Sequence, residues 1–220
     1  TITAQGKVLL NFDYAYDKLP YDSLTYDNPS EFRRLIRIRT PEYKSHGAYF
    51  TENHDERRAV ANFGYNSKKA NAAAGCLLTL PGMRFFNQQQ WFGPENKIVV
   101  QLRRAKSEVV KQECVSFYDR LFEVLKLPCM KYGEFQQLDV VGSVNVIAYT
   151  YAYKDEHVLI AVNYSPNRSG CGIRLEDAPE GTVSFVEMIQ QKTIQVDVTE
   201  VRNQGLYVVF EPYQVQVFKY

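Results

Sequence analysis

The sequence contains no long apolar run. No window comes near the roughly 18 consecutive apolar residues that a membrane-spanning helix requires, so we expect no membrane partner. Charge of one sign is not in excess either, because 26 basic and 25 acidic residues give a formal net charge of +1. A chain so close to neutrality has no general electrostatic reason to bind nucleic acid or an acidic surface. We therefore expect no nucleic-acid partner.

Cysteine is scarce, with only Cys76, Cys114, Cys129 and Cys171 in 220 residues. No two of them form a Cys-x-x-Cys pair, so the usual spacing of a zinc site is missing, and we predict neither a metal nor a cofactor. Cys76 and Cys114 fall on apolar faces of expected helices, which favours buried free thiols over a disulfide. Reduced thiols, and an N-terminal stretch without the features of a signal peptide, favour a cytoplasmic protein.

Hydrophobic residues make up 45% of the chain, which is enough for a sizeable core in one large domain or in two unequal ones. The first half alternates short apolar runs with amphipathic stretches, a pattern typical of strands and helices in turn. Asn28 and Pro29 are start signals for one helix, Ser67 for the next, and Pro41 and Pro81 are stop signals. The expected strands are residues 8–12, 47–51 and 83–86, and the expected helices are residues 30–39, 68–80 and about 107–125. This order predicts parallel strands with helical crossovers.

The pattern changes after Pro128. Short alternating runs are separated by turn signals such as Pro166-Asn167, which is typical of a small antiparallel β-sandwich. The expected strands lie within residues 144–153, 157–165, 171–175, 183–187, 192–196, 206–210 and 215–219. The sequence therefore predicts an α/β domain over residues 1–127 and an all-β domain over residues 128–220.

One polar motif follows an expected strand. Residues 49–58 read YFTENHDERR, so Asn53, His54 and Asp55 come directly after the strand at residues 47–51. In parallel β/α architectures the chemistry collects at the carboxyl ends of the strands, which favours a catalytic or ligand-binding role. The alternative is structural, because such residues can also cap the next helix and hydrogen-bond the loop. The local pattern alone leaves both open.

The segment FTENHDERRAVANF resembles the Asn-His-Asp motif at the seventh strand of the α-amylase family, glycoside hydrolase family 13, and Phe50, Asn53, His54 and Asp55 match it. Other segments resemble that family in the same order. FDYAYDKLPYD is similar to the sixth strand, LPGMRFF to the eighth, and SFYDRLFEVLKLPCMKYGEFQQL to the last barrel helix. VIAYTYAYKDEHVLIAVNYS and GLYVVFEPYQVQVFKY are similar to the first and last strands of its C-terminal sandwich.

This resemblance implies the last three β/α units of a TIM-type (β/α)8 barrel, strands six to eight, followed by a C-terminal antiparallel β-sandwich. It implies an α-amylase-like retaining enzyme that acts on α-glucosidic bonds of starch, glycogen or maltooligosaccharides. In the family the nucleophile and the acid/base lie on the fourth and fifth strands, which have no counterpart here, so the chain alone is expected to be inactive. Asp55 would be the third acidic catalytic residue. His54 and Asn53 would bind the sugar.

The loop after the eighth-strand segment departs from the family pattern. Residues 87–93 read NQQQWFG, where relatives usually have a histidine, an acid and Gly-Gln, and then an acid before a glycine. Only Gln90 and Gly93 keep the expected type, and Gln89 in place of glycine restricts the backbone. Trp91 is a candidate for stacking on a sugar, with packing under the loop as the alternative. Either the substrate rim is remodelled or the parent enzyme has lost activity.

Two other functions fit the same residues. The chain can be a non-catalytic module that binds carbohydrate or forms a structural lid, or a degenerate relative that acts through protein interaction. A three-strand piece of a barrel also leaves two edges unpaired and apolar faces exposed. We therefore expect the missing N-terminal barrel half, or a second copy of the chain, as a partner beside the α-glucan or oligosaccharide. Substrate linkage and length stay open, as does hydrolysis against transglycosylation.

Two groups of charged residues have ordinary interpretations. The arginines of the helix at residues 30–39, Arg39 among them, favour a solvated face, because nucleic-acid binding needs a broader basic surface. The aspartates at residues 13–22, including Asp17, match no dedicated calcium loop. Hydrogen bonding within the loop is expected for them.

Overall fold

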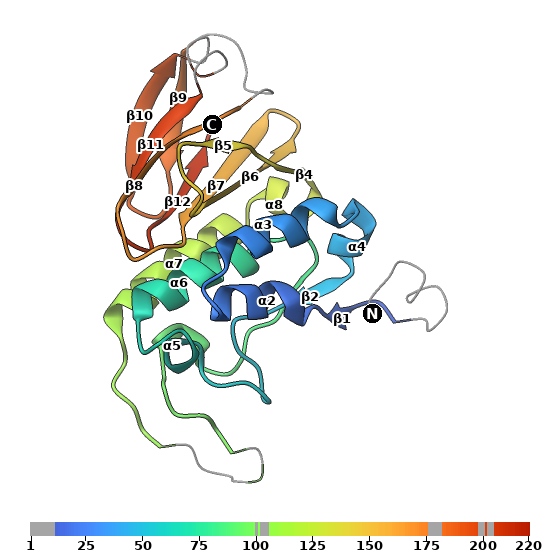
Figure 1. Ribbon diagram of the computed structural model, residues 1–220, viewed down its shortest axis with the longest axis vertical. Coiled ribbons are helices and arrows are strands. Elements are labelled where there is room, and N and C mark those ends of the chain that lie inside the picture. Colours follow the sequence, from blue (N-terminus) through green and yellow to red (C-terminus); the bar gives the residue numbers. More distant parts are fainter. Residues whose placement is uncertain (1–11, 100, 102–105, 176–181, 198–200, 202–204) are drawn as a thin grey trace. The chain divides into compact units, whose positions relative to one another are not determined.

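The computed structural model describes residues 12–99, 101, 106–175, 182–197, 201 and 205–220. The structure divides into two compact units, Thr1–Asp119 and Arg120–Tyr220. Helix α7 (Gln112–Leu125) runs across this division. The first unit is a parallel α/β segment and the second consists mainly of antiparallel sheets (Figure 1). The predicted boundary between residues 127 and 128 stays a prediction.

The first unit contains a parallel sheet of three short strands in the order β1–β2–β3. They are β1 (Ala15–Tyr16), β2 (Gly47–Tyr49) and β3 (Met83–Arg84). Ala15 lies opposite Gly47 and Ala48 lies opposite Met83, so all three strands run in the same direction. This confirms the predicted parallel α/β segment. β2 and β3 begin where strands are predicted, but both are shorter than predicted.

The first expected strand lies almost entirely outside the described residues. Of its residues 8–12, only Phe12 belongs to the described part of the chain. The strand that pairs with β2 on the side opposite β3 is β1, which lies a few residues later, within the segment FDYAYDKLPYD. The resemblance of that segment to a barrel strand is thus matched by a strand in the structure.

Gly82 shows how closely β3 approaches β2. Its φ is +111°, a conformation that side chains rarely adopt, and a Cβ there would lie 2.5 Å from the carbonyl oxygen of Gly47. The carbonyl oxygen of Lys44 would lie at 2.7 Å. Glycine is therefore required at position 82 for the chain to enter β3 beside β2.

The helices of the first unit follow or separate these strands. They are α2 (Lys18–Thr25), α3 (Pro29–Ile38), α4 (Pro41–Ser45), α5 (Ala59–Asn62), α6 (Ser67–Leu77) and the beginning of α7. The predicted cap of α3 is confirmed, because Asn28 Oδ1 accepts a hydrogen bond of 2.9 Å from Glu31 N. The cap of α6 is Asn66, whose Oδ1 accepts from Lys69 N at 3.1 Å, and not Ser67 as predicted.

The start of α7 is also later than predicted. The expected helix begins near residue 107, but α7 begins at Gln112. Residues before it are held by distant partners: Glu108 accepts hydrogen bonds from the backbone of Glu95 and Asn96, at 2.7 and 3.1 Å. Lys111 N donates to the Phe92 carbonyl at 3.0 Å. These bonds compete with helix formation in residues 107–111.

The core of the first unit is formed by apolar side chains of its helices and of the chain next to the sheet. α2 packs with α3 and α6, and α5 packs with α6. The buried side chains include Leu24, Phe32, Leu35, Ile36, Phe50, Val60, Phe63 and Leu77. The predicted apolar face of α3 is therefore confirmed.

Arg39 corrects one prediction. It is buried, at 9% exposure, and its Nη2 donates a hydrogen bond of 2.9 Å to Asp17 Oδ1. The interpretation as a solvated residue is wrong here, because Arg39 follows the last residue of α3 with an extended backbone and pairs with the buried carboxylate of Asp17. Arg34 is solvated, as predicted, and binds Glu31 within the helix.

The second unit contains two antiparallel sheets after α8 (Pro128–Tyr132). The strands are β4 (Glu134–Gln137), β5 (Val140–Val141), β6 (Val146–Tyr153), β7 (Glu156–Asn163), β8 (Ser169–Ile173), β9 (Thr182–Glu187), β10 (Lys192–Asp197), β11 (Leu206–Phe210) and β12 (Val215–Lys219). One sheet has the order β10–β9–β12–β7–β6–β4 and the other β11–β8–β5. The seven expected strands are confirmed, while β4 and β5 were not predicted.

Both sheets of the second unit contribute to one apolar core. Val146, Leu159 and Phe185 come from the larger sheet, and Ile173 and Phe210 come from the smaller one. All five are fully buried. Buried and exposed residues alternate along β11, as the sequence pattern predicts, whereas β6 and β7 each have six consecutive buried residues.

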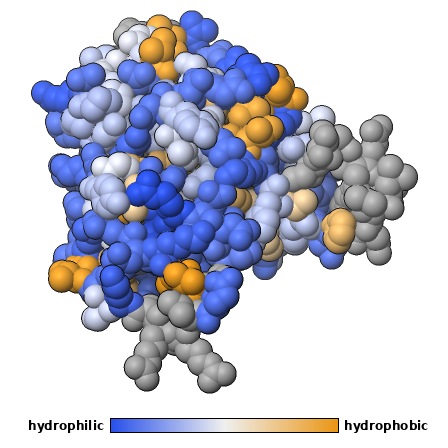
Figure 2. Space-filling view, turned by 60° about the horizontal axis from the view of Figure 1, so that its bottom comes forward, coloured by the Kyte–Doolittle hydropathy of each residue, from blue (hydrophilic) through white to orange (hydrophobic). Residues whose placement is uncertain are grey.

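All four cysteines are free and buried, which confirms the predicted buried thiols. Among the helices of the described residues, none has both the length and the apolar character needed to cross a membrane. The face of the molecule in Figure 2 is mostly hydrophilic, and its apolar residues form small, separate groups.

Candidate functional site

Two loops leave the parallel sheet at the same edge. Tyr49 lies opposite Arg84, and Phe85 N donates a hydrogen bond of 2.9 Å to the Tyr49 carbonyl, so the carboxyl ends of β2 and β3 are adjacent. The first loop, residues 50–58, follows β2, and the second loop, residues 85–93, follows β3. In parallel sheets this edge is where ligand-binding groups gather.

Asn53 shapes the first loop. It is buried, and its Oδ1 accepts hydrogen bonds from the backbone nitrogens of Asp55 and Glu56, both 2.9 Å long. An asparagine side chain that binds the backbone two and three residues later stabilises a tight turn. Asn53 thus fixes the turn that carries His54 and Asp55. Its predicted contact with a sugar stays a prediction.

The side chains of His54 and Asp55 reach solvent from this turn. They are 55% and 76% exposed, and His54 Nε2 lies 3.3 Å from Asp55 Oδ2. Lys97 donates a hydrogen bond to the backbone carbonyl of Asp55 and ties the turn to a later segment. An exposed carboxylate can accept hydrogen bonds from several hydroxyl groups, and the neighbouring imidazole adds a donor or an acceptor.

Trp91 belongs to the second loop. It lies in the short 3-10 helix η1 (Gln90–Phe92) and is half-buried. Its ring packs edge to face against Phe92, with 5.6 Å between the ring centres. The structure therefore brings His54 and Asp55 together on one loop and places Trp91 on the neighbouring one. Its stacking on a sugar stays a prediction.

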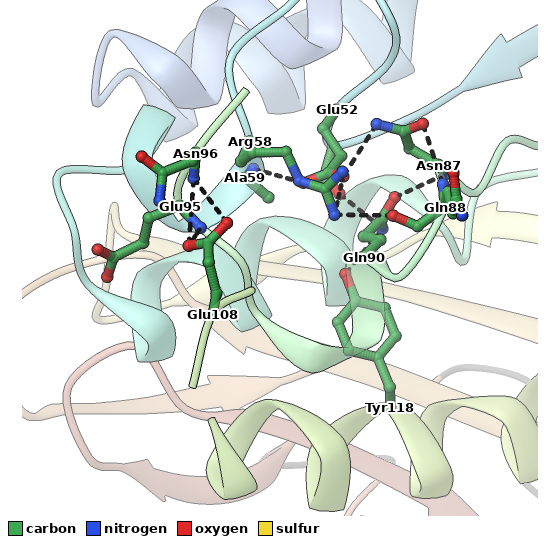
Figure 3. A network of polar contacts seen from close by, with 11 residues as sticks. Glu52, Arg58, Ala59, Asn87, Gln88, Gln90, Glu95, Asn96, Glu108 and Tyr118 are labelled. Atoms are coloured by element: carbon green, nitrogen blue, oxygen red, sulfur yellow. Dashed lines mark hydrogen bonds and ion pairs between the residues drawn. The ribbon is translucent and has the colours of Figure 1, made fainter. Parts of the chain in front are cut away.

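A buried ion pair, which the sequence did not reveal, lies beneath the first loop (Figure 3). Glu52 and Arg58 have side chains only 1% and 2% exposed, and Arg58 Nη2 lies 3.1 Å from Glu52 Oε1. Glu52 Oε2 accepts a hydrogen bond of 2.6 Å from Ala59 N, the first residue of α5. Burial raises the pKa of Glu52, while Arg58 and the hydrogen bonds from Ala59 and Asn87 act in the opposite direction.

The second loop binds to this pair and to Thr51 of the first loop. Asn87 Nδ2 donates to Glu52 Oε1 at 3.2 Å, and Arg58 Nη2 donates to the Gln88 carbonyl at 2.8 Å. Gln90 Nε2 donates to Thr51 Oγ1, and Gln90 Oε1 accepts from Asn87 N at 3.1 Å. Asn87 stands where the family pattern has a histidine, and its amide here points to buried Glu52 (Figure 3).

Gln89 adopts the left-handed backbone conformation, with φ of +59° and ψ of +14°. Gly93, at the other end of η1, also has a positive φ, of +69°. Glycine adopts this conformation readily, whereas other residues do so at a cost. Gln89 therefore adopts the conformation that glycine would adopt at this position, and the restriction expected from its side chain takes the form of a cost in conformational energy.

One hollow in the described part of the first unit has none of the predicted site residues in its lining. Its volume is about 620 Å³. It is lined by Arg58, Gln89, Phe92, Pro94, residues 96–99 and residues 106–110. None of Asn53, His54, Asp55 and Trp91 lines it. The motif is thus presented on an open rim and does not line this hollow.

The fold matches solved α-amylases over nearly the whole chain. The noncanonic maltogenic α-amylase AmyB from Thermotoga neapolitana matches with a TM-score of 0.76 at 15% identity, covering 99% of this chain and 53% of AmyB. The α-amylase from Geobacillus thermoleovorans, complexed with acarbose, gives 0.74 at 15% identity over 100% of this chain and 52% of its own. The α-amylase from H. orenii gives 0.71 at 17% identity, over 100% and 51%.

These matches define the fold of the chain. No protein-family model and no curated protein matches the sequence. The chain spans about half the length of the α-amylases that it matches. Its parallel α/β segment and antiparallel sheets are those of a partial α-amylase-like module, which confirms the resemblance seen in the sequence.

Proposed function

We propose that this chain is the C-terminal part of an α-amylase-like retaining glycoside hydrolase acting on α-glucosidic bonds of starch, glycogen or maltooligosaccharides. The observation that carries the proposal is the exposed carboxylate of Asp55 at the carboxyl edge of parallel strands, in a fold shared with half of several α-amylase chains. In this proposal β1, β2 and β3 are the sixth to eighth strands of a (β/α)8 barrel. The second unit is then the C-terminal β-sandwich.

Asp55 would act on the sugar through hydrogen bonds. An ionised carboxylate that accepts hydrogen bonds from ring hydroxyls favours the transition state, because these bonds strengthen as positive charge develops on the ring. His54, 3.3 Å from Asp55, would bind the same sugar. Trp91 would offer a ring for stacking from the neighbouring loop.

The reaction needs two further carboxyl groups, which in retaining enzymes lie about 5–5.5 Å apart. Glu52 is unsuited to either role, since its carboxylate is buried and engaged by Arg58 and Ala59. We therefore propose that another half of the barrel supplies the nucleophile and the acid/base. β1 and β3 are the edges of the sheet in the described residues, and strand edges with unpaired backbone groups are suited to such pairing. A second copy of the chain is the alternative partner.

A second candidate function is carbohydrate binding, or protein interaction, without catalysis. The observation that favours it concerns Asn87, which stands at the position where the family pattern has a histidine. Its side-chain amide donates a hydrogen bond to the buried carboxylate of Glu52. A rim that lacks this histidine and the acids after it offers fewer contacts to a sugar. A non-catalytic module would still bind maltooligosaccharides, whereas a degenerate relative would not.

The test uses the longer protein encoded with the region upstream of residue 1. Its rate of starch hydrolysis is compared with that of the Asp55→Asn variant, which keeps the shape but loses the charge. We expect kcat/KM to fall about 100-fold or more, as when other preorganised transition-state contacts are removed. The exposed turn variant Asp155→Asn serves as control and should not change the rate. An unchanged rate in Asp55→Asn would remove Asp55 from the mechanism.

Sugar binding by the 220-residue chain, together with hydrolysis by the longer protein, separates the non-catalytic module from the degenerate relative. Calorimetric titration with maltoheptaose measures binding, and product analysis measures hydrolysis. Binding without hydrolysis, even in the longer protein, supports the non-catalytic module, and neither activity supports the degenerate relative. Size-exclusion chromatography tests the partner: a compact monomer that binds no hydrophobic dye would contradict an exposed barrel edge.

A further inference from the structure

Glu52 closes the loop that carries the proposed sugar-binding residues. Its carboxylate contacts Arg58 at 3.1 Å and accepts a hydrogen bond of 2.6 Å from Ala59 N. Residue 52 enters the loop, and residues 58 and 59 leave it. One buried carboxylate therefore joins the two ends of the turn that presents His54 and Asp55.

The same two side chains hold the neighbouring loop. Arg58 donates to the Gln88 carbonyl at 2.8 Å, and Asn87 donates to Glu52 at 3.2 Å. These partners are 30 and 35 residues away in the sequence. Figure 3 shows both members of the pair between the two loops, with Asn87 and Gln88 on one side and Ala59 on the other. The position of one turn is thus coupled to the position of the next.

A gain in stability does not account for this arrangement. Replacing a buried ion pair by apolar side chains is often neutral or stabilising, because removing two charges from water is costly. Arg58 Nε adds to the cost, since it is a buried donor without a hydrogen-bond partner among the described residues. The geometry that the pair imposes on the two loops is the better explanation.

We propose that Glu52 and Arg58 are a positioning pair, which holds the turn at residues 53–55 and the turn at residues 87–90 in one arrangement at the carboxyl edge of the sheet. The inference rests on the proposed function, because the groups so positioned are those proposed to bind the sugar. Glu52 and Arg58 themselves are buried and do not touch it. They act through Asn53, Asp55 and the second loop.

The test is amide hydrogen exchange, residue by residue, in the wild type and in Glu52→Gln. This variant keeps the size of the side chain and an oxygen for Ala59 N, but removes the charge that holds Arg58. We expect the amides of Asp55 and Glu56 in the first turn, and of Gln88 in the second, to exchange about tenfold faster or more. Binding of maltoheptaose should weaken by a similar factor.

Asp17→Asn is the matched control. Asp17 forms another buried ion pair in the described part of this unit, with Arg39, and the two side chains are 2% and 7% exposed. This variant should lower global stability but leave the exchange of Asp55 and Gln88 unchanged under native conditions. If it accelerates the same amides as strongly as Glu52→Gln does, the effect of Glu52 is a general loss of stability, and the positioning proposal is overturned.

A second pair of variants keeps the test decisive if Glu52→Gln folds poorly. Arg58→Lys retains the positive charge, whereas Arg58→Gln removes it. We expect Arg58→Lys to keep most of the protection that Arg58→Gln loses at Asp55 and Gln88. Equal exchange in the two variants would show that the charge does not hold the turns, which would overturn the proposal.

The same measurements distinguish a failure of the proposed function from a failure of the positioning pair. If the wild type binds no maltoheptaose while the exchange pattern follows the expectation, the sugar-binding assignment of Asp55 fails and the coupling between the turns stands. If the wild type binds the sugar, and Glu52→Gln binds it equally well with unchanged exchange, the positioning pair fails and the function stands.

Discussion

The side-chain amide of Gln90 donates a hydrogen bond of 2.8 Å to the hydroxyl oxygen of Tyr118 on α7. Both residues are buried, at 2% and 3% exposure. The same nitrogen of Gln90 donates to Thr51 Oγ1 at 2.9 Å. A single amide thus connects the loop after β3 with the loop after β2 and with the helix that follows them.

Removing the hydroxyl of Tyr118 should therefore destabilise the first unit. In Tyr118→Phe one N–H group of Gln90 loses a buried acceptor, and we expect the free energy of unfolding to fall by about 1–2 kcal/mol. Urea unfolding monitored by circular dichroism measures the change. Tyr207→Phe is the control, because Tyr207 is 72% exposed, and its effect should stay within about 0.5 kcal/mol. Equal stabilities of the two variants would show that the Gln90 contact contributes nothing.

Gln89→Gly should stabilise the protein, although glycine usually weakens a fold. Gln89 has a φ of +59°, and this conformation costs a residue with a side chain about 1–2 kcal/mol. Glycine avoids that cost and loses about 0.5–1 kcal/mol through the greater freedom of the unfolded chain, so a net gain of up to about 1.5 kcal/mol is expected.

The adjacent variant Gln88→Gly is the comparison for this effect. Gln88 is not among the residues with positive φ, so only the entropic loss applies, and we expect a destabilisation of about 0.5–1 kcal/mol. Thermal unfolding of both variants gives the sign directly. Destabilisation of the same size in both would contradict strain at Gln89.

Local signals in the sequence predict much of this fold. Asn28 and Pro29 mark the start of α3, because capping and the fixed φ of proline depend only on neighbouring residues. The alternation within residues 144–153 and the turn signal at residues 153–156 locate β6 and β7, although both strands have six consecutive buried residues. The Asn-His-Asp motif likewise indicates the exposed turn at Asp55.

Contacts between distant residues explain what the sequence did not reveal. The helical period around Val110 predicts a longer α7, but Glu108 binds the backbone of residues 95 and 96. Glu52 and Arg58 resemble ordinary surface charges within YFTENHDERR. Their burial depends on Asn87 and Gln88, which belong to another strand-loop unit. No local pattern carries that information.

The four buried cysteines should be unreactive in the native protein. Burial raises the pKa of Cys171 to about 11, and the pKa of Cys129 to about 12, where the carboxylate of Glu156 adds to the effect. Burial also raises the pKa of Cys76 and Cys114. Because the thiolate is the reactive form, we expect labelling by a disulfide reagent near pH 8 to be more than about 100-fold slower than in denaturant.

The unfolded chain provides the internal control for the labelling experiment, because all four thiols should react rapidly in denaturant. A thiol that reacts in the native protein as fast as in denaturant would contradict the burial of that residue. Mass spectrometry of the labelled peptide identifies which cysteine is responsible.

The ion pair between Glu156 and Lys219 predicts a loss of stability in acid. Glu156 Oε2 lies 2.8 Å from Lys219 Nζ, and its other oxygen accepts a hydrogen bond of 3.0 Å from Cys129 N. Partial burial disfavours the charged form of Glu156, but the contacts with Lys219 and Cys129 outweigh it, so the pKa of Glu156 lies below its ordinary value. The contribution of a carboxylate with a lowered pKa is present above the unfolded value of about 4.3 and is lost as the pH falls through the folded value.

Glu156→Gln tests this pH dependence, because it keeps an oxygen for Cys129 N but removes the charge beside Lys219. Near neutral pH we expect it to lower the free energy of unfolding by about 0.5–1 kcal/mol, since Lys219 is partly exposed and the pair is screened by solvent. Well below the folded pKa the wild type has lost the same charge, and the difference between the two proteins should disappear. The exposed neighbour Asp155, changed to asparagine, should show no such convergence. A difference at Glu156 that stays constant or grows in acid would contradict the lowered pKa.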